Sequence, residues 1–300
     1  SPPAWDAARY LINSLEAFDL VRHPSLASLK ELYFVRNTVR PSIGLVLPTM
    51  PIYLLFGVSD DAPTLWTNAL FLAIIVFSVY GIGKRLFDVR VGLLAALLIG
   101  LNPEMIRLSR VYWPELGVAA VASLAVYLLI LSDFLRRRAF VLLAGLVLGA
   151  GMMQRPIFPL VFLAGPLAFV FIGALFAGTK ASGETFGHRL LVRFLPGIAL
   201  FALPVLLIDL PFYRQYGKQM LAYITGFQET GTFAPVQNAY SLQSLLWYVT
   251  NLYASVSWPL HILFVIALVV YLLALIRRRV SASSAILLAW FAVPYIALSL

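Results

Sequence analysis

The stretch LGVAAVASLAVYLLILS, residues Leu116–Ser132, contains no charged side chain and decides the fold of this chain. A helix needs roughly 20 predominantly apolar residues to cross a bilayer, and this stretch is close to that length. Glu115 stands directly before it, and Arg136, Arg137 and Arg138 follow it shortly afterwards. The stretch therefore predicts a membrane span with one strongly basic end.

The composition agrees with a membrane protein. Of the 300 residues, 61% are hydrophobic and only 12% are charged, and the mean hydropathy is +0.90. An ordinary soluble domain has about 25% charged residues. The sequence contains no cysteine, which excludes disulfides, thiolate metal sites and cysteine nucleophiles. We expect an integral membrane protein with a single membrane-embedded domain, residues 1–300.

Apolar windows predict an all-α, polytopic transmembrane bundle of about eight spans. These are Leu65–Gly83, Val91–Pro103, Leu116–Ser132, Ala139–Met153, Pro156–Ala177, Phe194–Ile208, Val256–Ile276 and Ser281–Leu300. Residues 1–64 form an external segment with surface helices, 65–210 the core spans, 211–255 a second external loop and 256–300 the last spans. Because the chain starts at Ser1 and ends in an apolar run, we expect truncation at both ends.

Two features of these spans carry further expectations. Pro41–Gly57 is apolar but contains three prolines, so we expect a broken helix at the surface, with a ninth span as the alternative. The eight predicted spans contain no Asp, Glu, Lys or Arg in their apolar cores. Ion-coupled transporters usually place ionisable residues near mid-membrane, so this absence argues against a pump or symporter.

The distribution of charge predicts the orientation. One set of loops holds twelve basic and three acidic residues, which accounts for the whole net charge of +9. The basic residues are Lys84, Arg85, Arg90, Arg136, Arg137, Arg138, Lys180, Arg189, Arg193, Arg277, Arg278 and Arg279. Basic loops mark the cytoplasmic side, so the other face lies outside, in the periplasm, the cell exterior or a lumen. The net positive charge is thus explained by the cytoplasmic loops, and we expect no nucleic acid as a partner.

A charged constellation lies at the outer boundary, between Asn102 and Glu115. Glu104, Arg107 and Arg110 are three residues apart, so a helix would place them on one face. Arginines there can hold a lipid phosphate by forked hydrogen bonds. The alternative is ion pairing among themselves, with the side chains reaching toward lipid head groups. Arg155 adds a third cation at the same depth.

Soluble-enzyme motifs are absent. The sequence has no GxGxxG, no phosphate-binding P-loop and no HExxH, and its three histidines have no metal-ligand spacing. Asp6, near the start of the polar leader, carries a carboxylate on the predicted outer face. It is either the start of a surface helix, since Asp is a common N-cap, or a functional acid.

The run Asp6-Ala7-Ala8-Arg9-Tyr10 resembles the Asp-Glu-x-x-Tyr segment of the dolichyl-phosphate-mannose protein mannosyltransferase-like family, glycosyltransferase family 39. Further segments follow in the family's order over residues 5–165. They are Arg40-Pro41-Ser42-Ile43, Leu55-Phe56-Gly57, Gly83-Lys84-Arg85-Leu86-Phe87, Gly92-Leu93-Leu94-Ala95-Ala96, Asn102-Pro103, Arg110 with Glu115, and Ala144-Gly145-Leu146-Val147-Leu148-Gly149. The sequence departs from the family pattern at three places: Ala7 replaces the second acid, Arg40 replaces a histidine, and Gln154-Arg155 stands near where a lysine is common.

The resemblance implies a GT-C fold and transfer of a sugar from a polyprenyl phosphate to a lipid, glycan or protein acceptor. We expect the protein in a prokaryotic plasma membrane, with its active site facing outside. The resemblance also implies that Asp6 is the general base. The expected site residues are Asp6 and Glu115 for catalysis, and Arg107, Arg110, Arg155, Tyr10 and Arg40 for substrate binding. No cofactor is required, although Asp6 and Glu115 could hold a divalent cation. The alternative function is a flippase or transporter of a lipid-linked substrate.

Overall fold

The computed structural model describes residues 5–34, 43–59, 63–155, 158–176, 185–229, 258–277 and 284–299, and within these ranges all regular structure is helical. The elements are α1 (Trp5–Arg22), α2 (Leu26–Phe34), α3 (Ile43–Val46), η1 (Leu47–Thr49), α4 (Met50–Phe56), η2 (Pro63–Thr67), α5 (Asn68–Leu86), α6 (Val89–Gly100), α7 (Pro103–Ser109), α8 (Pro114–Leu131), α9 (Arg138–Met152), α10 (Phe158–Phe176), α11 (Phe186–Arg189), η3 (Leu190–Phe194), α12 (Leu195–Glu229), α14 (Trp258–Ile276) and α15 (Ala285–Ser299). The predicted all-α class is confirmed.

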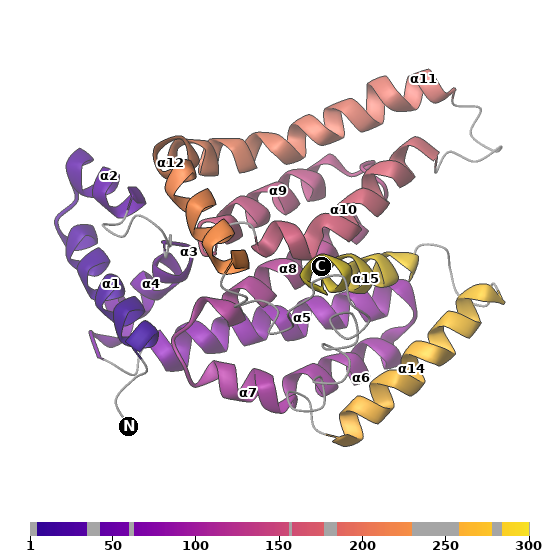
Figure 1. Ribbon diagram of the computed structural model, residues 1–300, viewed down its shortest axis with the longest axis horizontal. Coiled ribbons are helices and arrows are strands. Elements are labelled where there is room, and N and C mark those ends of the chain that lie inside the picture. The colour runs from indigo at the N-terminus through magenta and orange to yellow at the C-terminus, as the bar shows by residue number, and fades with distance from the viewer. Residues whose placement is uncertain are drawn as a thin grey trace.

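The centre of the bundle is α8. It packs against α5, α9 and α10, while α6 covers α5, α12 covers α9 and α15 covers α10 (Figure 1). The fully buried side chains of the central cluster include Val126, Leu129, Val141, Leu148 and Leu163. Helices α1 to α4 gather at one end of the bundle, near α7 and the start of α8, which we call the α7 end. The opposite end, near α11, is called the α11 end.

Every predicted span corresponds to a helix in the structure. Within the described residues, four helical stretches are long and apolar enough to cross a membrane: Leu65–Leu86, Pro114–Leu131, Pro159–Phe176 and Phe186–Gln219. A fifth is added if Val89–Gly100 and Pro103–Ser109, bent by 56° relative to each other, form one broken span. Shorter apolar stretches among the described residues are Ile43–Phe56, Arg138–Met152, Ile262–Ala274 and Ala285–Pro294. The protein is therefore an integral membrane protein with a helical core.

The proline-rich segment is one continuous helical stretch, Ile43–Phe56, rather than the broken helix that the prolines predict. A short 3₁₀ turn, η1, separates α3 from α4 and contains Pro48. The segment is not an isolated surface element, however, because Leu45, Val46 and Tyr53 are buried against neighbouring helices. Its other face is exposed at Leu54 and Leu55. The segment α3–η1–α4 therefore lies within the α7 end of the bundle. It packs against α1, and α3 also contacts α9.

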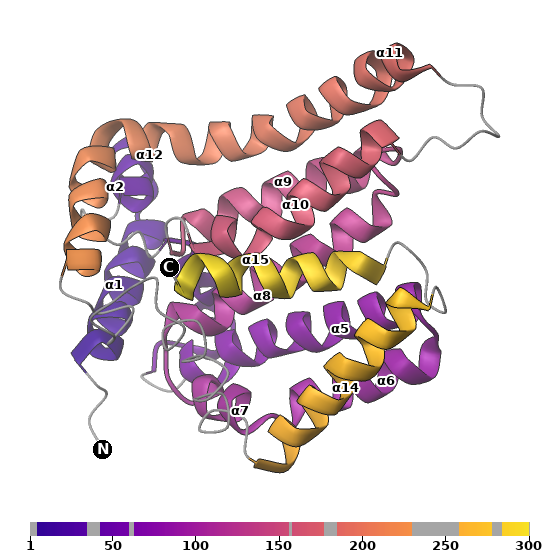
Figure 2. The same ribbon diagram turned by 45° about the vertical axis from the view of Figure 1, so that its right-hand side comes forward.

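Helix α12 differs most from the prediction. It does not end at Ile208 but continues to Glu229, so residues 211–229 of the predicted loop are helical. The helix turns sharply along its length (Figure 2), and it contains Pro204 and Pro211. The hydroxyl of Tyr33 on α2 donates to the carbonyl of Ile208 at this point. Prolines and an inserted side-chain hydrogen bond are established causes of helix bending. The rest of the predicted loop lies outside the described residues.

The extension also corrects the expectation of charge-free spans. Asp209 lies within the stretch Phe186–Gln219 and is only 3% exposed. Neither carboxylate oxygen has a hydrogen-bond partner within the described part of the chain. Burial of an unpaired carboxylate is costly, because the group must lose its hydration without compensation. Asp209 is therefore a destabilising feature of the bundle.

We expect Asp209→Asn to raise the free energy of unfolding by about 1–2 kcal/mol at neutral pH, because the amide carries no charge to bury. Thermal unfolding in detergent, followed by the loss of helical circular dichroism, measures the change. Asp133→Asn is the control: Asp133 is half-exposed and paired with Arg136 at 3.4 Å, so its replacement should change stability little. A lower melting temperature for Asp209→Asn would contradict the account.

Candidate functional site

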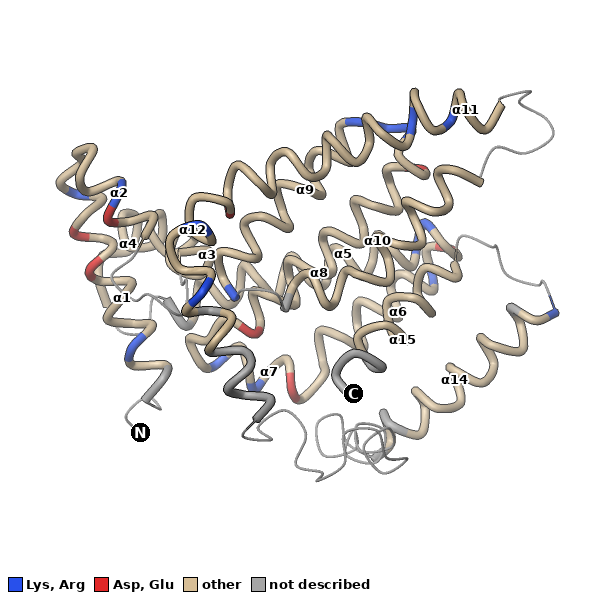
Figure 3. The backbone as a smooth tube through the Cα atoms, turned by 45° about the horizontal axis from the view of Figure 1, so that its top comes forward, with Lys and Arg blue, Asp and Glu red and all other residues tan. Residues whose placement is uncertain are grey.

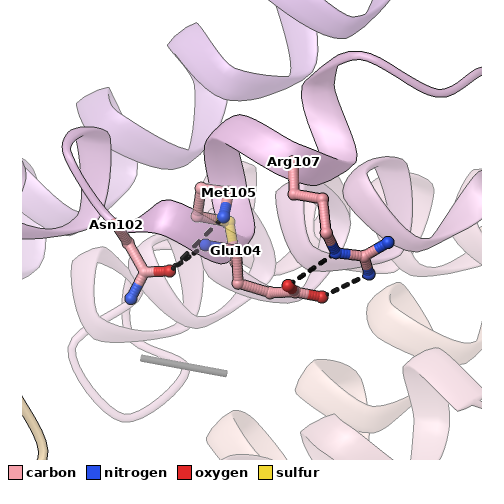
Figure 4. A network of polar contacts seen from close by, with 4 residues as sticks. All are labelled: Asn102, Glu104, Met105 and Arg107. Carbon is pink, nitrogen blue, oxygen red and sulfur yellow. Dashed lines mark hydrogen bonds and ion pairs between the residues drawn. The ribbon is translucent and has the colours of Figure 1, made fainter. Parts of the chain in front are cut away.

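Helix α7 begins with a complete N-terminal cap. The side-chain oxygen of Asn102 accepts hydrogen bonds from the backbone N–H groups of Glu104, at 2.9 Å, and Met105, at 3.3 Å (Figure 4). Pro103 occupies the first helical position, where its missing N–H is not needed. The cap fixes the start of α7 and places Glu104 in its first turn.

Glu104 and Arg107 form a forked ion pair on α7. The Nε and Nη2 atoms of Arg107 donate to the two carboxylate oxygens of Glu104 at 2.7 and 2.6 Å (Figure 4). The predicted spacing of three residues thus brings them together, in the arrangement of mutual ion pairing. Arg110 is exposed at the end of the helix and makes no ion pair with any described residue. Arg107 is thus neutralised by Glu104, whereas the positive charge of Arg110 has no acidic partner among the described residues.

Glu115 and Arg155 meet although forty positions separate them. Nη1 of Arg155, just beyond the end of α9, donates to Oε1 of Glu115, in the first turn of α8. Their side chains are 36% and 38% exposed, respectively, so the pair is only partly screened by solvent. The sequence predicted that Arg155 lies at the same membrane depth as the charged residues of the outer boundary. In the structure Arg155 forms an ion pair with one of them, Glu115.

Two glycines make this approach possible. A Cβ atom on Gly117 would overlap with the side-chain amide of Gln154, so α8 and residue 154 are in direct contact. On the other side, a Cβ atom on Gly44 would lie 2.6 Å from the carbonyl oxygen of Ala150, and the N–H of Gly44 donates to Met153 O at 3.2 Å. The end of α9 is therefore clamped between α3 and α8, which fixes the position of the residues that follow.

These residues form what we call the α7–α9 charged cluster: Glu104, Arg107, Arg110, Glu115 and Arg155. Three arginines and two glutamates leave a net charge of +1. The carboxylate of Glu115 also acts on Arg107, whose charged form it favours. Glu115 lies near the N-terminus of α8, where the helix dipole favours an acid. The cluster thus combines compensated ion pairs with a surplus positive charge, which suits an anionic ligand.

A buried polar network fixes the turn between α7 and α8. The hydroxyl of Tyr112 hydrogen-bonds Thr49 Oγ1 at 2.7 Å, and Thr49 in turn contacts Thr67 Oγ1 at 3.0 Å. The amide of Asn68 donates to Ser109 O and Val111 O at 3.0 and 2.9 Å. Burial raises the pKa of Tyr112, so this hydroxyl stays neutral. The network holds the charged cluster on a rigid support.

Helix α1 lies against the same turn. Tyr10 is 8% exposed and packs in one apolar cluster with Tyr112 and Leu116. Ser14, one turn further, hydrogen-bonds the hydroxyl of Tyr53 at 2.8 Å. Asp6 belongs to the first turn of α1, one turn before Tyr10. Its side chain and the whole of Arg40 lie outside the described part of the structure, so their roles stay predictions.

Metal binding also stays a prediction. Among the residues whose placement is described, no three His, Cys, Asp or Glu side chains gather as a candidate metal site. Glu115 has one oxygen occupied by Arg155. A divalent cation between Asp6 and Glu115 would need the Asp6 side chain, which lies outside the described side chains.

The sequence predicted the charged residues of the cluster but not the uncharged residues that hold them in position. Gly44, Gly117 and Thr49 carry no charge and belong to apolar runs, so nothing in the linear pattern distinguishes them from ordinary helix residues. Gln154 was visible next to Arg155, but its contact with α8 depends on a glycine far away in sequence. The available signal was the small residue one turn inside α8, at the position facing a neighbouring helix.

The described residues form an all-helical membrane bundle with the α7–α9 charged cluster at one end. The family model of the dolichyl-phosphate-mannose-protein mannosyltransferases matches residues 49–182, which confirms the predicted resemblance and indicates a membrane glycosyltransferase. The matched stretch contains the entire α7–α9 charged cluster, whereas Asp6 and Arg40 precede it. No curated protein and no solved structure matches the chain.

Proposed function

We propose that the protein transfers a sugar from a polyprenyl-phosphate donor to a lipid, glycan or protein acceptor at the α7 end of the bundle. The observation that carries the proposal is the α7–α9 charged cluster, in which Glu115 pairs with Arg155 and also interacts electrostatically with Arg107. The family match over residues 49–182 supports it, because it covers this cluster and indicates a glycosyltransferase.

The chemistry needs a cationic site for the leaving group. As the acceptor hydroxyl attacks the anomeric carbon, the bond to the phosphate oxygen breaks and negative charge develops on polyprenyl phosphate. Cations held in place beforehand stabilise that charge. Arg110 makes no ion pair with a described residue, so it offers its whole guanidinium to a phosphate. Arg107 and Arg155, already paired with glutamates, add positive charge to the site.

The acceptor hydroxyl must lose a proton as it attacks, and a carboxylate can take it. We assign this role to Asp6, in the first turn of α1. Support comes from Tyr10, which anchors the next turn of α1 against Tyr112 and Leu116 at the start of α8. Tyr10 is therefore a positioning residue, since its buried ring faces the protein core. Glu115 orients Arg155 and can also accept from a substrate hydroxyl, while Arg40 stays an expected binding residue.

We place the α7 end outside the membrane. Figure 3 shows mainly basic segments, with a few acidic ones, around α11 and the ends of neighbouring helices, whereas acidic and basic segments occur together around α1, α2 and α7. Basic loops are retained on the cytoplasmic side, which leaves the α7 end on the outer face. A prokaryotic plasma membrane is the setting we propose.

Release of polyprenyl phosphate tests this function. The purified protein is reconstituted in vesicles with polyprenyl-phosphate mannose, glucose or arabinose, and extracted membranes supply the acceptors. We expect at least one donor to release polyprenyl phosphate, together with transfer of its sugar to extracted material. If none of the donors reacts while the protein remains folded, the proposed function is wrong.

A second candidate function is a flippase or transporter of a lipid-linked substrate. One observation favours it: the buried, unpartnered carboxylate of Asp209 lies inside a membrane-spanning stretch, as in many transport pathways. Movement of a fluorescent polyprenyl phosphate across reconstituted vesicles, without sugar transfer and abolished by Asp209→Asn, would support this alternative.

Arg110→Glu should weaken binding of polyprenyl phosphate by about 10- to 100-fold, because a charge-assisted hydrogen bond is replaced by repulsion. Titration of the lipid into protein held in nanodiscs measures the effect. Arg22→Glu, an exposed arginine at the far end of α1, is the control and should bind as the wild type does. Equal affinities for Arg110→Glu and the wild type would remove Arg110 from the phosphate site.

A further inference from the structure

A cavity of about 190 Å³ lies at the α11 end of the bundle, away from the α7–α9 charged cluster. Its lining comes from the last turn of α5, the end of α8 with the turn that follows, the second half of α10 and the start of α15. Three of these helices belong to stretches long enough to cross a membrane: Leu65–Leu86, Pro114–Leu131 and Pro159–Phe176. The cavity therefore lies where these stretches approach their ends, at the boundary between the hydrocarbon region and the polar surface.

The lining combines an apolar interior with charged residues at the surface. Leu129 and Ile286 line the cavity and are each 1% exposed, and Phe169 of α10 adds an aromatic wall. The two charged lining residues differ in exposure: Arg85 is exposed, and the side chain of Asp133 is 41% exposed. A hydrocarbon chain gains free energy by burial in such an interior, while a charged group stays at the polar boundary. The cavity therefore suits an amphiphile.

The charges at the cavity determine the head group. Asp133 is paired with Arg136 at 3.4 Å. Arg85 forms no ion pair with any described residue, so its guanidinium is available to a ligand. Lys84 precedes Arg85 and adds to the positive potential. Arginine holds phosphate by forked hydrogen bonds, and basic pockets between membrane helices receive phosphate head groups. The head group should therefore be anionic.

The turn after α8 forms part of the wall and has an unusual backbone. Asp133, Phe134 and Leu135 have φ angles of 49°, 50° and 67°, in the left-handed region that residues other than glycine disfavour. Two glycines of neighbouring helices accommodate it. A Cβ atom on Gly173 of α10 would overlap with the ring of Phe134, and one on Gly197 of α12 would lie 2.7 Å from Cδ1 of Leu135. Backbone strain that is held in place by packing occurs at ligand clamps, so the wall is a built feature.

We propose that this cavity binds one anionic phospholipid of the leaflet at the α11 end. The phosphate contacts Arg85, and part of an acyl chain lies between α8, α10 and α15. Arg85, Asp133 and Arg136 together leave one positive charge, which matches the single negative charge of a phosphodiester. A phosphate monoester, such as that of polyprenyl phosphate, carries about −1.5 to −2 at neutral pH. This site is separate from sugar transfer and goes beyond the proposed function.

Lipid binding by charge-reversal variants tests the head-group contact. Delipidated protein in detergent is titrated with dioleoyl phosphatidylglycerol and with dioleoyl phosphatidylcholine, and native mass spectrometry measures the affinity for the first bound lipid. We expect the wild type to prefer phosphatidylglycerol by about 10-fold or more, because choline brings its own cation beside Arg85. Arg85→Glu should weaken phosphatidylglycerol binding by about 10- to 100-fold and abolish the preference. Arg90→Glu is the control, since Arg90 is exposed on α6 and does not line the cavity.

A second pair of variants tests the apolar interior. Ile130 lines the cavity, so Ile130→Trp should fill it and weaken phosphatidylglycerol binding about as much as Arg85→Glu does. Leu191→Trp, at a residue of η3 that is 65% exposed, should bind as the wild type does. Thermal unfolding verifies that each variant is folded. Independently of any variant, phosphatidylglycerol with a diazirine on one acyl chain should label the wild type at residues 129–134 or 169–170.

Several outcomes would overturn this site. Equal affinities for the two lipids in the wild type, or equal losses in Arg85→Glu and Arg90→Glu, would assign binding to the basic surface in general. Displacement of phosphatidylglycerol by an equal concentration of inorganic phosphate would show that the hydrocarbon chain is not recognised. Tighter binding of polyprenyl phosphate than of phosphatidylglycerol, lost in Arg85→Glu, would assign the cavity to that lipid instead.

Discussion

Asp6→Asn is expected to lower the rate of sugar transfer by about 10²- to 10⁴-fold, the usual contribution of a general base. The amide has nearly the shape of the carboxylate but cannot take the proton of the acceptor hydroxyl. Donor binding should persist, because the proposed phosphate contacts come from α7 and the end of α9 rather than from α1. The loss should therefore appear in kcat, with little change in the affinity for the donor lipid.

Asp19→Asn is the matched control for this prediction. Asp19 lies on the same helix, and its side chain is 77% exposed beside His23. Its replacement should leave transfer unchanged. If Asp6→Asn retains wild-type transfer, Asp6 is not the base, and Glu115→Gln becomes the next variant to measure. An equal loss in both variants would indicate a disturbance of α1 rather than of the chemistry.

Gly44→Ala is expected to reduce stability by about 1–3 kcal/mol and to impair transfer, because α3 and α9 are in contact at this residue. The added Cβ atom would lie 2.6 Å from a backbone oxygen, that of Ala150, which cannot move as a flexible side chain could. Separation of α3 from α9 would shift the residues after Met152 and weaken the ion pair between Glu115 and Arg155. Thermal unfolding and transfer by the same preparation measure both effects.

Gly217→Ala is the control for the glycine at position 44. Gly217 is also helical, but a Cβ atom there meets no atom within 4 Å. Alanine has the higher helix propensity, so this variant should be as stable as the wild type or up to about 1 kcal/mol more stable. If Gly44→Ala is equally well tolerated, the close packing of α3 on α9 does not determine the geometry of the charged cluster.

The helices could be located from sequence because each is an apolar run bounded by charged or polar residues. Their ends were harder to locate. The predicted span after Phe194 stopped before Asp209, since a charged residue and Pro211 normally mark the end of a span. In the structure α12 continues through both, and Tyr33 hydrogen-bonds the backbone at the bend. Tertiary contacts of this kind leave no mark on the local sequence.

The charged cluster was predictable only in part. Glu104 and Arg107 pair because residues three apart share a helix face, and this follows from spacing alone. The contact between Glu115 and Arg155 depends on the antiparallel packing of α8 and α9, so sequence could suggest a common depth but not an ion pair. The close contact of Gly117 with Gln154 could be recognised only in the three-dimensional structure.

Photo-crosslinking of the donor tests the central claim most directly, since it locates the lipid phosphate. A polyprenyl-phosphate mannose analogue with a diazirine near the phosphate is bound to protein in nanodiscs, irradiated, and the labelled residues are identified by mass spectrometry. We predict labelling between Asn102 and Gly117 and next to Arg155, reduced by excess polyprenyl phosphate and by Arg110→Glu. Labelling confined to the basic loops of the α11 end, around Lys84 or Arg136, would contradict a donor site at the α7 end.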